Sequence, residues 1–424
     1  MTLKATEVFV PGAYPEHTYV ERAEQKLEET LKNALDTPGQ IISLSGPSKS
    51  GKTVLVEKVV GQEQLIAISG ASLKRPEDVW QHVLDWMDLP TSVSSSTTID
   101  GNIKGTASAS VGAGILGFVK GTGSLSATAE AGGSVKTEQT QERGGLLQVQ
   151  REIANSPFVV LIDDFHYMDR TLQVEVAKIL KEGVRLNIKI VTASVSHRND
   201  DVVRANPELR GRVKTIDLKY WSKQELEAIA KAGFGILNIG IAQEVINQFV
   251  IESAGSPQLM QLLCLQACFA LSANQKSLPF KDIEISSDKL KQILEQASTN
   301  TNYRSLIDVL DSGPRLRGTE RKTYNCYDNT SGDVYRVVLK AVAMNPPRLS
   351  FPYEELLRRT AKICVGESPV GSSVTSTCLH MSKLAQEKFP AERAIDWDEQ
   401  KQVFDIPDPY LLFYLRWSGR LLEE

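Results

Sequence analysis

Eight consecutive residues have the types and the spacing of a phosphate-binding loop. They are Gly46-Pro47-Ser48-Lys49-Ser50-Gly51-Lys52-Thr53, and they satisfy the pattern G-x-x-x-x-G-K-[ST] at every fixed position. Backbone N–H groups of such a loop point inward and, with the N-terminus of the following helix, form a concave anion site. The pattern predicts that Lys52 reaches the β- and γ-phosphates of a nucleotide and that Thr53 holds Mg²⁺.

The sequence on both sides of this loop predicts a strand, a loop and a helix. An apolar run at 41–44 indicates a buried strand that leads into the loop, and apolar residues from Val54 onward have the spacing of a helix. The alternative is that a turn rich in Gly and Ser matches the pattern by accident. The flanks favour phosphate binding, so we assign Val54 and the eight loop residues to a nucleotide site.

A second group with chemical potential is the acidic pair Asp163-Asp164. It ends the apolar run 158–162, which is typical of a central parallel strand covered on both faces. Ligands of such sheets bind at the carboxyl ends of the strands. An apolar strand followed by two Asp residues is more often structural when it stands alone. Together with the loop, it predicts that Asp163 holds Mg²⁺ and that Asp164 orients or deprotonates the attacking water.

Length and composition limit the class of protein. A chain of 424 residues with 41% hydrophobic content is globular and too long for one core. The net charge of −4 provides no global basic field for nucleic acid or anionic lipid, although a local patch stays open. Five cysteines without C-x-x-C spacing favour reduced thiols in a cytoplasmic protein. The sequence has no apolar run of about 18 residues and no N-terminal signal, so membrane insertion is not expected.

Strands alternate with helices over residues 1–220. Strands are predicted at 41–44, 65–68, 158–162, 188–193 and 213–218, and helices at 18–35, 76–87 and around 174–180. This alternation predicts an α/β core with a parallel, doubly wound sheet.

The segment 97–141 interrupts the core. Small or apolar residues alternate strictly with polar ones over 99–115 and over 119–131, and Leu116-Gly117-Phe118 lies between the two arms. A period of two predicts an amphipathic β-hairpin with an apolar tip. The alternative is a flexible excursion rich in Gly, Ser and Ala. Without this insert, the spacing from Lys52 to Asp163 fits a compact ATPase core.

The C-terminal half is predicted to be mainly helical. Helices at 243–249 and 257–271, separated by Gly255-Ser256-Pro257, indicate a helical domain at 221–310. The turn-rich segment 311–332 is predicted to be a linker. Residues 333–424 contain candidate helices at 334–344, 353–361 and 373–388, and 391–406 is expected to pair as a two-stranded wing. Three helices and a wing describe a winged helix.

With phosphate loop, acidic strand, helical lid and winged helix in this order, the chain resembles the AAA+/STAND superfamily of P-loop ATPases. Within it, the chain is similar to origin-recognition-type and archaeal or bacterial STAND-like ATPases, over most of residues 16–420 outside the insert. The pair Asp163-Asp164, in place of the Asp-Glu of AAA+ motors, is closer to STAND and origin-type proteins. The resemblance therefore implies slow ATP turnover and a molecular switch.

The resemblance also implies further catalytic residues. In such ATPases, the strand that follows the one with the acidic pair ends in a polar residue that senses the γ-phosphate. In this chain the candidates are Thr192, Ser194 and Ser196. An arginine near the edge of the next strand reaches a neighbouring subunit's nucleotide, and Arg210 and Arg212 stand there. The alternative for each arginine is a solvated surface charge.

Two more segments resemble parts that enclose the nucleotide. Gly255-Ser256-Pro257 resembles the lid motif in which the proline, here Pro257, helps the helical domain to cover the nucleotide. Residues 19–22 resemble the segment that packs near the adenine. The chain has Gln25 where an acidic residue often stands, and this departure leaves the adenine contact open.

Two classes of function fit these features. The first is an ATP-dependent switch that changes shape or forms a homo-oligomer on binding a protein cue, as STAND proteins of bacterial antiviral defence and signalling do. The alternative is a DNA-associated ATPase of the origin-binding or transposition-helper type. In a winged helix that binds DNA, the third helix would lie in the major groove. Here that helix carries His380, Lys383 and Lys388 together with Glu387, so it is only mildly basic.

Overall fold

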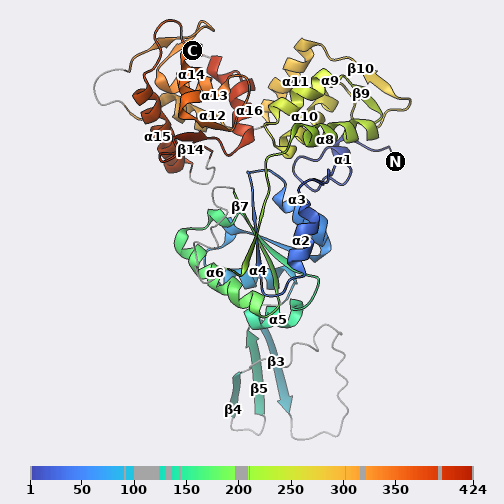
Figure 1. The fold of residues 1–424 in the computed structure, drawn as a ribbon. Coiled ribbons are helices and arrows are strands. Elements are labelled where there is room, and N and C mark those ends of the chain that lie inside the picture. The colour runs from blue at the N-terminus through green and yellow to red at the C-terminus, as the bar shows by residue number, and fades with distance from the viewer. Residues whose placement is uncertain are drawn as a thin grey trace.

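The computed structural model describes residues 2–89, 92–99, 124–129, 135–142, 145–195, 209, 211–300, 302–315, 321–389 and 394–422. Figure 1 shows an α/β core, two helical domains on one side of it, and a small group of strands that projects from the other side. No helix in the described part of the chain combines the length and the apolar character needed to cross a membrane.

The core is built on a five-stranded parallel sheet with the order β2-β6-β7-β1-β8. Its strands are β1 (Ile41–Ser45), β2 (Leu65–Ser69), β6 (Val159–Asp163), β7 (Lys189–Ser194) and β8 (Val213–Asp217). Strand β1 is buried throughout its length, as its apolar residues Ile41, Ile42 and Leu44 predict for a buried strand. The five predicted strands are all present, and the predicted α/β fold class is confirmed.

Helices cover both faces of this sheet. Helices α2 (Leu27–Leu35) and α3 (Lys52–Val60) pack with Ile42 and Leu44 on one face. On the other face, Ile41 belongs to a cluster that includes residues of α4 (Asp78–Trp86), α5 (Leu146–Ile153) and α6 (Arg170–Arg185). The helix predicted at 18–35 begins only at Leu27, because Lys26 has left-handed backbone geometry with a φ of 47°.

The insert contains three strands, β3 (Ser92–Ile99), β4 (Ser124–Ala129) and β5 (Val135–Glu142), in the order β3-β5-β4. The arm predicted at 99–115 lies almost entirely outside the described residues, so the pairing of the two predicted arms stays a prediction. Among the described strands, β5 lies between β3 and β4 and pairs antiparallel with both. β4 and β5 are close in the sequence, so their pairing closes a much shorter loop than pairing of β3 with β4. The predicted tip lies outside the described residues.

The lid domain follows the core. It contains α8 (Lys223–Ile236), α9 (Gln243–Glu252), α10 (Pro257–Ala270) and α11 (Ser287–Thr299), together with the N-terminal α1 (Ala5–Val8) and the paired strands β9 (Ile239–Ile241) and β10 (Lys281–Ile283). Pro257 opens α10 as predicted, after Ser256, whose Oγ accepts a hydrogen bond from the backbone N–H of Leu259. Cys264 and Cys268 are buried on this helix.

The C-terminal domain holds the three predicted helices and a small antiparallel sheet. Its elements are α12 (Arg304–Ser312), β11 (Tyr324–Asn325), β12 (Ser331–Gly332), α13 (Val334–Ala343), β13 (Ser350–Pro352), α14 (Tyr353–Ile363), α15 (Gly371–Lys388), β14 (Asp396–Asp398), β15 (Val403–Asp405) and α16 (Pro409–Trp417). The sheet has the order β13-β15-β14. Short 3-10 turns lie at Gln62–Gln64, Gly70–Ser72, Phe165–Tyr167 and Arg420–Leu422.

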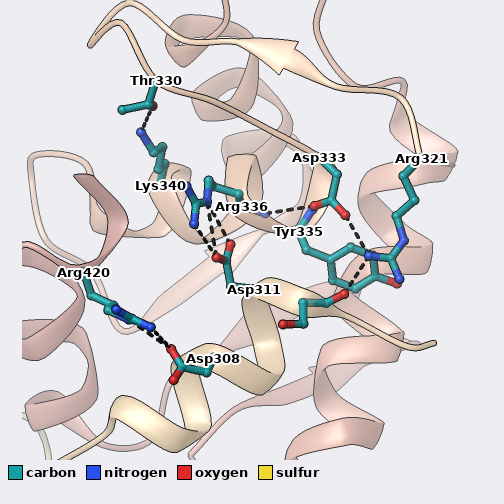
Figure 2. A network of polar contacts seen from close by, with 10 residues as sticks. Asp308, Asp311, Arg321, Thr330, Asp333, Tyr335, Arg336, Lys340 and Arg420 are labelled. Atoms are coloured by element: carbon teal, nitrogen blue, oxygen red, sulfur yellow. Dashed lines mark hydrogen bonds and ion pairs between the residues drawn. The ribbon is translucent and has the colours of Figure 1, made fainter. Parts of the chain in front are cut away.

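A network of ion pairs joins α12, α13 and the end of the chain (Figure 2). Asp311 pairs with Arg336 at 2.7 Å, and Asp308 pairs with Arg420 at 2.7 Å. Arg321 donates a hydrogen bond of 2.7 Å to Asp333, the residue that caps α13. These contacts hold Asp311 and Arg321, which lie in the segment 311–332, within the C-terminal domain.

Helix α16 belongs to two hydrophobic cores. Phe413 packs in the core of the lid domain, and Leu411 and Leu412 pack in the core of the C-terminal domain. At the end of α16, Arg416 pairs with Glu252 of α9 at 2.8 Å, with side-chain exposures of 6% and 0%. The helix therefore joins the two domains, and Figure 1 shows it between them.

Candidate nucleotide site

The phosphate loop lies between β1 and α3, at the carboxyl edge of the sheet. Gly46 has to be glycine, because a Cβ there would lie 2.8 Å from the Cβ of Leu218. Gly51, with a φ of 91°, turns the chain into α3. The Lys52 Nζ donates hydrogen bonds to the carbonyl oxygens of Gly46 at 3.2 Å and Pro47 at 2.9 Å. Lys52 is buried, and this burial lowers the pKa of its ammonium group.

The two residues predicted to hold Mg²⁺ contact each other. The Thr53 Oγ1 donates a hydrogen bond of 2.5 Å to Oδ2 of Asp163, although the two residues are 110 positions apart in the sequence. The other oxygen, Oδ1, accepts a hydrogen bond of 2.9 Å from the backbone N–H of Asp164. A hydroxyl and a carboxylate are oxygen ligands of the kind that Mg²⁺ prefers, so this pair fits the ion.

Asp164 lies directly after β6 in left-handed backbone geometry, with a φ of 54°. Its main chain is close to Gly70, where a Cβ would lie 2.6 Å from the carbonyl oxygen of Asp164. Burial, and then the neighbouring carboxylate of Asp163, raise the pKa of Asp164. A carboxylate with a raised pKa is a stronger base, which suits the predicted role toward water.

A cavity of about 470 Å³ lies against the loop. Its lining comes from the N-terminal segment, the core and the lid, and includes Tyr19, Arg22, Lys52, Asp163, Asp164 and Pro257. This volume lies within the range of about 300–1,000 Å³ that is usual for ligand sites. Pro257 and residues 19–22, which were predicted to enclose the nucleotide, thus share one cavity with the phosphate loop.

The N-terminal wall of the cavity is bound to the lid. Gln261 of α10 donates a hydrogen bond of 2.7 Å to Oγ1 of Thr18 and accepts one of 3.2 Å from the backbone N–H of Val10. Tyr19 donates a hydrogen bond of 2.5 Å to Glu28. If α10 moves, the N-terminal wall therefore either moves with it or loses the two hydrogen bonds to Gln261.

Trp221 is a site residue that the sequence did not reveal. Its Nε1 donates a hydrogen bond of 2.9 Å to the carbonyl oxygen of Ser50 in the phosphate loop. The guanidinium carbon of Arg22 lies 5.0 Å from the centroid of the indole ring, and Arg22 pairs with Glu225 at 3.0 Å. These contacts connect the loop to the start of the lid domain. No motif includes Trp221, and its only signal is an aromatic residue just after the last core strand.

The predicted sensor and arginine residues lie at different places. Thr192 is buried within β7 and donates a hydrogen bond of 3.5 Å to the carbonyl oxygen of Ile42. Ser194 ends β7 beside Ser45, nearer the loop. Arg212 is exposed and precedes β8, at the opposite edge of the parallel sheet from the loop. Ser196 and Arg210 lie outside the described residues.

The position of Arg212 leaves it far from the phosphate loop of its own chain. Parallel strands of five residues separate the two edges, at about 3.3 Å per residue. Any contact of Arg212 with a nucleotide would therefore involve the site of a second subunit, and this role stays a prediction.

No protein-family model matches the sequence, and no curated protein matches it. Among solved structures, the chain is similar to the Walker-type ATPase of Pyrococcus abyssi, with 15% identity, coverage of 93% of this chain and 95% of that chain, and a TM-score of 0.48. It is similar to the Aeropyrum pernix ORC2 protein, with 12% identity, coverage of 100% and 98%, and a TM-score of 0.48.

A third similar structure is Cdc6p from Pyrobaculum aerophilum, with 12% identity, coverage of 100% of this chain and 99% of that chain, and a TM-score of 0.43. These likenesses are weak. The α/β fold of the chain is therefore inferred from the order of its sheet, and the phosphate-binding loop from the contacts of Lys52 and Thr53.

Proposed function

We propose that the protein binds ATP with Mg²⁺ and hydrolyses it slowly, as a molecular switch of the AAA+/STAND type. The observation that carries this proposal is the contact of Thr53 with Asp163 beside Lys52, at the wall of a cavity of about 470 Å³. A cation, a metal-binding hydroxyl and a carboxylate converge there, as binding of a nucleoside triphosphate requires.

Each residue has a role in this proposal. Lys52 binds the β- and γ-phosphates, and the backbone N–H groups of residues 48–53 cradle them. Thr53 and Asp163 would hold Mg²⁺, which neutralises charge on the phosphates when bound. Asp164 orients the attacking water or accepts its proton, supported by its position next to Asp163 and by its raised pKa.

A switch is favoured over a motor by how the cavity is built. Its walls come from the N-terminal segment, the core and the lid, so ligand binding changes the contacts among these parts. Helix α16 then connects the lid to the C-terminal domain through Glu252 and Arg416. The proposed output is a change of shape or the assembly of a homo-oligomer in the cytoplasm in response to a protein cue, as in bacterial defence or signalling.

Arg210 and Arg212 are the proposed contacts between subunits of such an oligomer. The exposed position of Arg212, away from the nucleotide site of its own chain, supports a role toward a neighbour. Thr192, Ser194 and Ser196 remain the candidate γ-phosphate sensors, and Ser194 has the most suitable position because it ends β7 beside Ser45.

The alternative function is DNA binding through the C-terminal domain, whose three helices and three paired strands follow the order of a winged helix. The predicted reading helix, α15, supports it weakly. Nδ1 of His380 lies 2.9 Å from the hydroxyl of Tyr335, so His380 is engaged within the domain. Lys383 and Lys388 are exposed, but Glu387 lies between them. We therefore favour the switch, and binding to a short DNA duplex separates the two.

ATP hydrolysis by purified protein with Mg²⁺ tests the proposal. The wild type should release phosphate slowly, and Asp164→Asn should reduce the rate about 10²- to 10⁴-fold while ATP stays bound, because an amide cannot accept the proton. Asp163→Asn should instead weaken Mg²⁺-dependent binding of ATP. Glu175→Gln on the surface of α6 is the matched control and should behave as the wild type. Equal hydrolysis rates for all four proteins would contradict the proposal.

A further inference from the structure

Lys49 stands apart from the other residues of the phosphate loop. Its backbone has a φ of 58°, a left-handed conformation that is unfavourable for most residues other than Gly. Its side chain leaves the loop and reaches the C-terminal domain, more than three hundred positions further along the chain. Nζ of Lys49 donates hydrogen bonds of 2.9 Å to both carboxylate oxygens of Asp408. It also lies 4.2 Å from the centroid of the Tyr410 ring.

The structure holds Asp408 firmly in this position. Its Oδ1 accepts a hydrogen bond of 3.0 Å from the backbone N–H of Tyr410 and caps α16. Its Oδ2 accepts a hydrogen bond of 2.5 Å from the hydroxyl of Tyr303, just before α12. The side-chain exposures of 29% for Lys49 and 15% for Asp408 mean that this ion pair is partly shielded from water. Three donors therefore hold the Asp408 carboxylate: Lys49, the backbone N–H of Tyr410 and the hydroxyl of Tyr303.

Helix α16 carries this contact to the lid. Asp408 lies at its N-terminal end, and Arg416 at its C-terminal end forms the buried ion pair with Glu252 of α9. Trp417 donates a hydrogen bond of 2.7 Å to the same carboxylate. One short helix therefore connects the phosphate loop with the domain whose Pro257 lines the cavity.

We propose that the contact between Lys49 and Asp408 is a latch between the phosphate loop and the C-terminal domain, and that the phosphates of a bound nucleotide open it. The inference rests on the proposed function, because it assigns the regulation of the same site. Bound phosphates place negative charge in the loop. The phosphates compete with Asp408 for the ammonium group of Lys49, and they repel the carboxylate of Asp408. Both effects weaken the latch.

Thermodynamic linkage makes the proposal quantitative. If ATP weakens the latch, loss of the latch strengthens ATP binding by the same factor, and such couplings are typically about 5- to 150-fold. Asp408→Asn is the suitable change, since Asn caps helices as well as Asp and still accepts a hydrogen bond, but carries no charge. The γ-phosphate adds charge, so the gain in affinity should be larger for ATP than for ADP.

The first experiment is titration of ATP and of ADP into the wild type and Asp408→Asn. Glu367→Gln is the matched control, because it removes one carboxylate from an exposed ion pair of the same domain. We expect about tenfold tighter ATP binding for Asp408→Asn, a smaller gain for ADP, and no change for the control. An ATP affinity of Asp408→Asn equal to or weaker than that of the wild type would overturn the latch.

The second experiment needs no nucleotide. Spin labels at Lys178→Cys in α6 and Lys383→Cys in α15 report the distance between the core and the C-terminal domain, and the five native cysteines are all buried. Asp408→Asn and Lys49→Gln should each lengthen or broaden this distance, whereas Glu367→Gln should not. If the wild type binds no ATP, the proposed function fails, and this distance still shows whether the contact of Lys49 with Asp408 holds the C-terminal domain to the core. An unchanged distance in both variants would refute the latch.

Discussion

The floor and the cover of the candidate site are built in different ways. The floor consists of the phosphate loop and the acidic pair Asp163-Asp164 at the end of β6, and each is a continuous stretch that a buried parallel strand delivers to one edge of the sheet. The cover consists of the N-terminal segment, Trp221, the lid and Asp408, and its contacts join residues that are far apart in the chain.

This difference has a physical consequence. The floor is fixed by β1 and β6, which are buried over nearly all of their length and have a paired strand on each side, so its geometry is available before a ligand binds. The cover depends on single hydrogen bonds and ion pairs, each of modest net free energy. A ligand can therefore rearrange the cover without disturbing the floor, which is what a switch needs.

The largest effect on stability is expected at the connection between the two helical domains. Glu252→Gln leaves Arg416 without its carboxylate in a buried position, and breaking such a pair costs about 3–5 kcal/mol. The variant should unfold at clearly lower denaturant concentration than the wild type, as followed by circular dichroism. Glu175→Gln, from the exposed pair with Lys178, should leave the midpoint nearly unchanged. Equal midpoints for both variants would show that the ion pair of Glu252 with Arg416 does not stabilise the connection between the domains.

The floor should show its charge arrangement in the pH dependence of hydrolysis. The pKa of Asp164 is raised by burial and by Asp163, so its base form is lost as pH falls through a value above the ordinary one of about 3.9. The hydrolysis rate should therefore fall toward acidic pH, and the midpoint of this fall should lie at a pH above the ordinary pKa of an Asp side chain. The residual hydrolysis rate of Asp164→Asn should not show this fall. A wild-type rate that is flat down to the ordinary Asp range would argue against Asp164 as the base.

Most of the fold and the floor could be predicted from the sequence because they depend on local patterns. The apolar runs of β1 and β6 define buried strands, and the loop residues Gly46 to Thr53 have fixed spacing. The contact of Thr53 with Asp163 then follows from the rule that parallel strands end at one edge. The floor was thus predictable before any tertiary contact was known.

The cover could not be predicted in the same way. Trp221 and Asp408 carry no motif, and their contacts with the loop span long stretches of chain that sequence spacing does not constrain. In the insert, the alternating pattern includes β4, whereas β3 and β5 lie almost entirely outside it. Period two also fixes only the faces of a strand and not its neighbour, so the pattern could not predict that β5 pairs with both. The start of α2 was misplaced because the backbone of Lys26 is left-handed, which no side-chain pattern reveals.

A smaller effect is expected where the cover contacts the loop through Trp221. Trp221→Phe keeps an aromatic ring beside Arg22 but removes the hydrogen bond to the Ser50 carbonyl oxygen. A hydrogen bond contributes about 0.5–1.5 kcal/mol, so ATP affinity should fall by about two- to tenfold. Trp86→Phe, a change at an exposed tryptophan of α4, is the control and should bind as the wild type does. Identical affinities for the two variants would exclude a role of Trp221 in holding the loop.

The most direct test of the central claim is an equilibrium titration of ATP with Mg²⁺ into the wild type and Lys52→Ala. Lys52 is the buried cation of the floor, and a hydrogen bond to a charged group contributes about 1.5–3 kcal/mol. We expect Lys52→Ala to bind ATP about tenfold to a hundredfold more weakly, and the surface variant Lys178→Ala to bind as tightly as the wild type. An affinity of Lys52→Ala equal to that of the wild type would contradict the assignment of the nucleotide site.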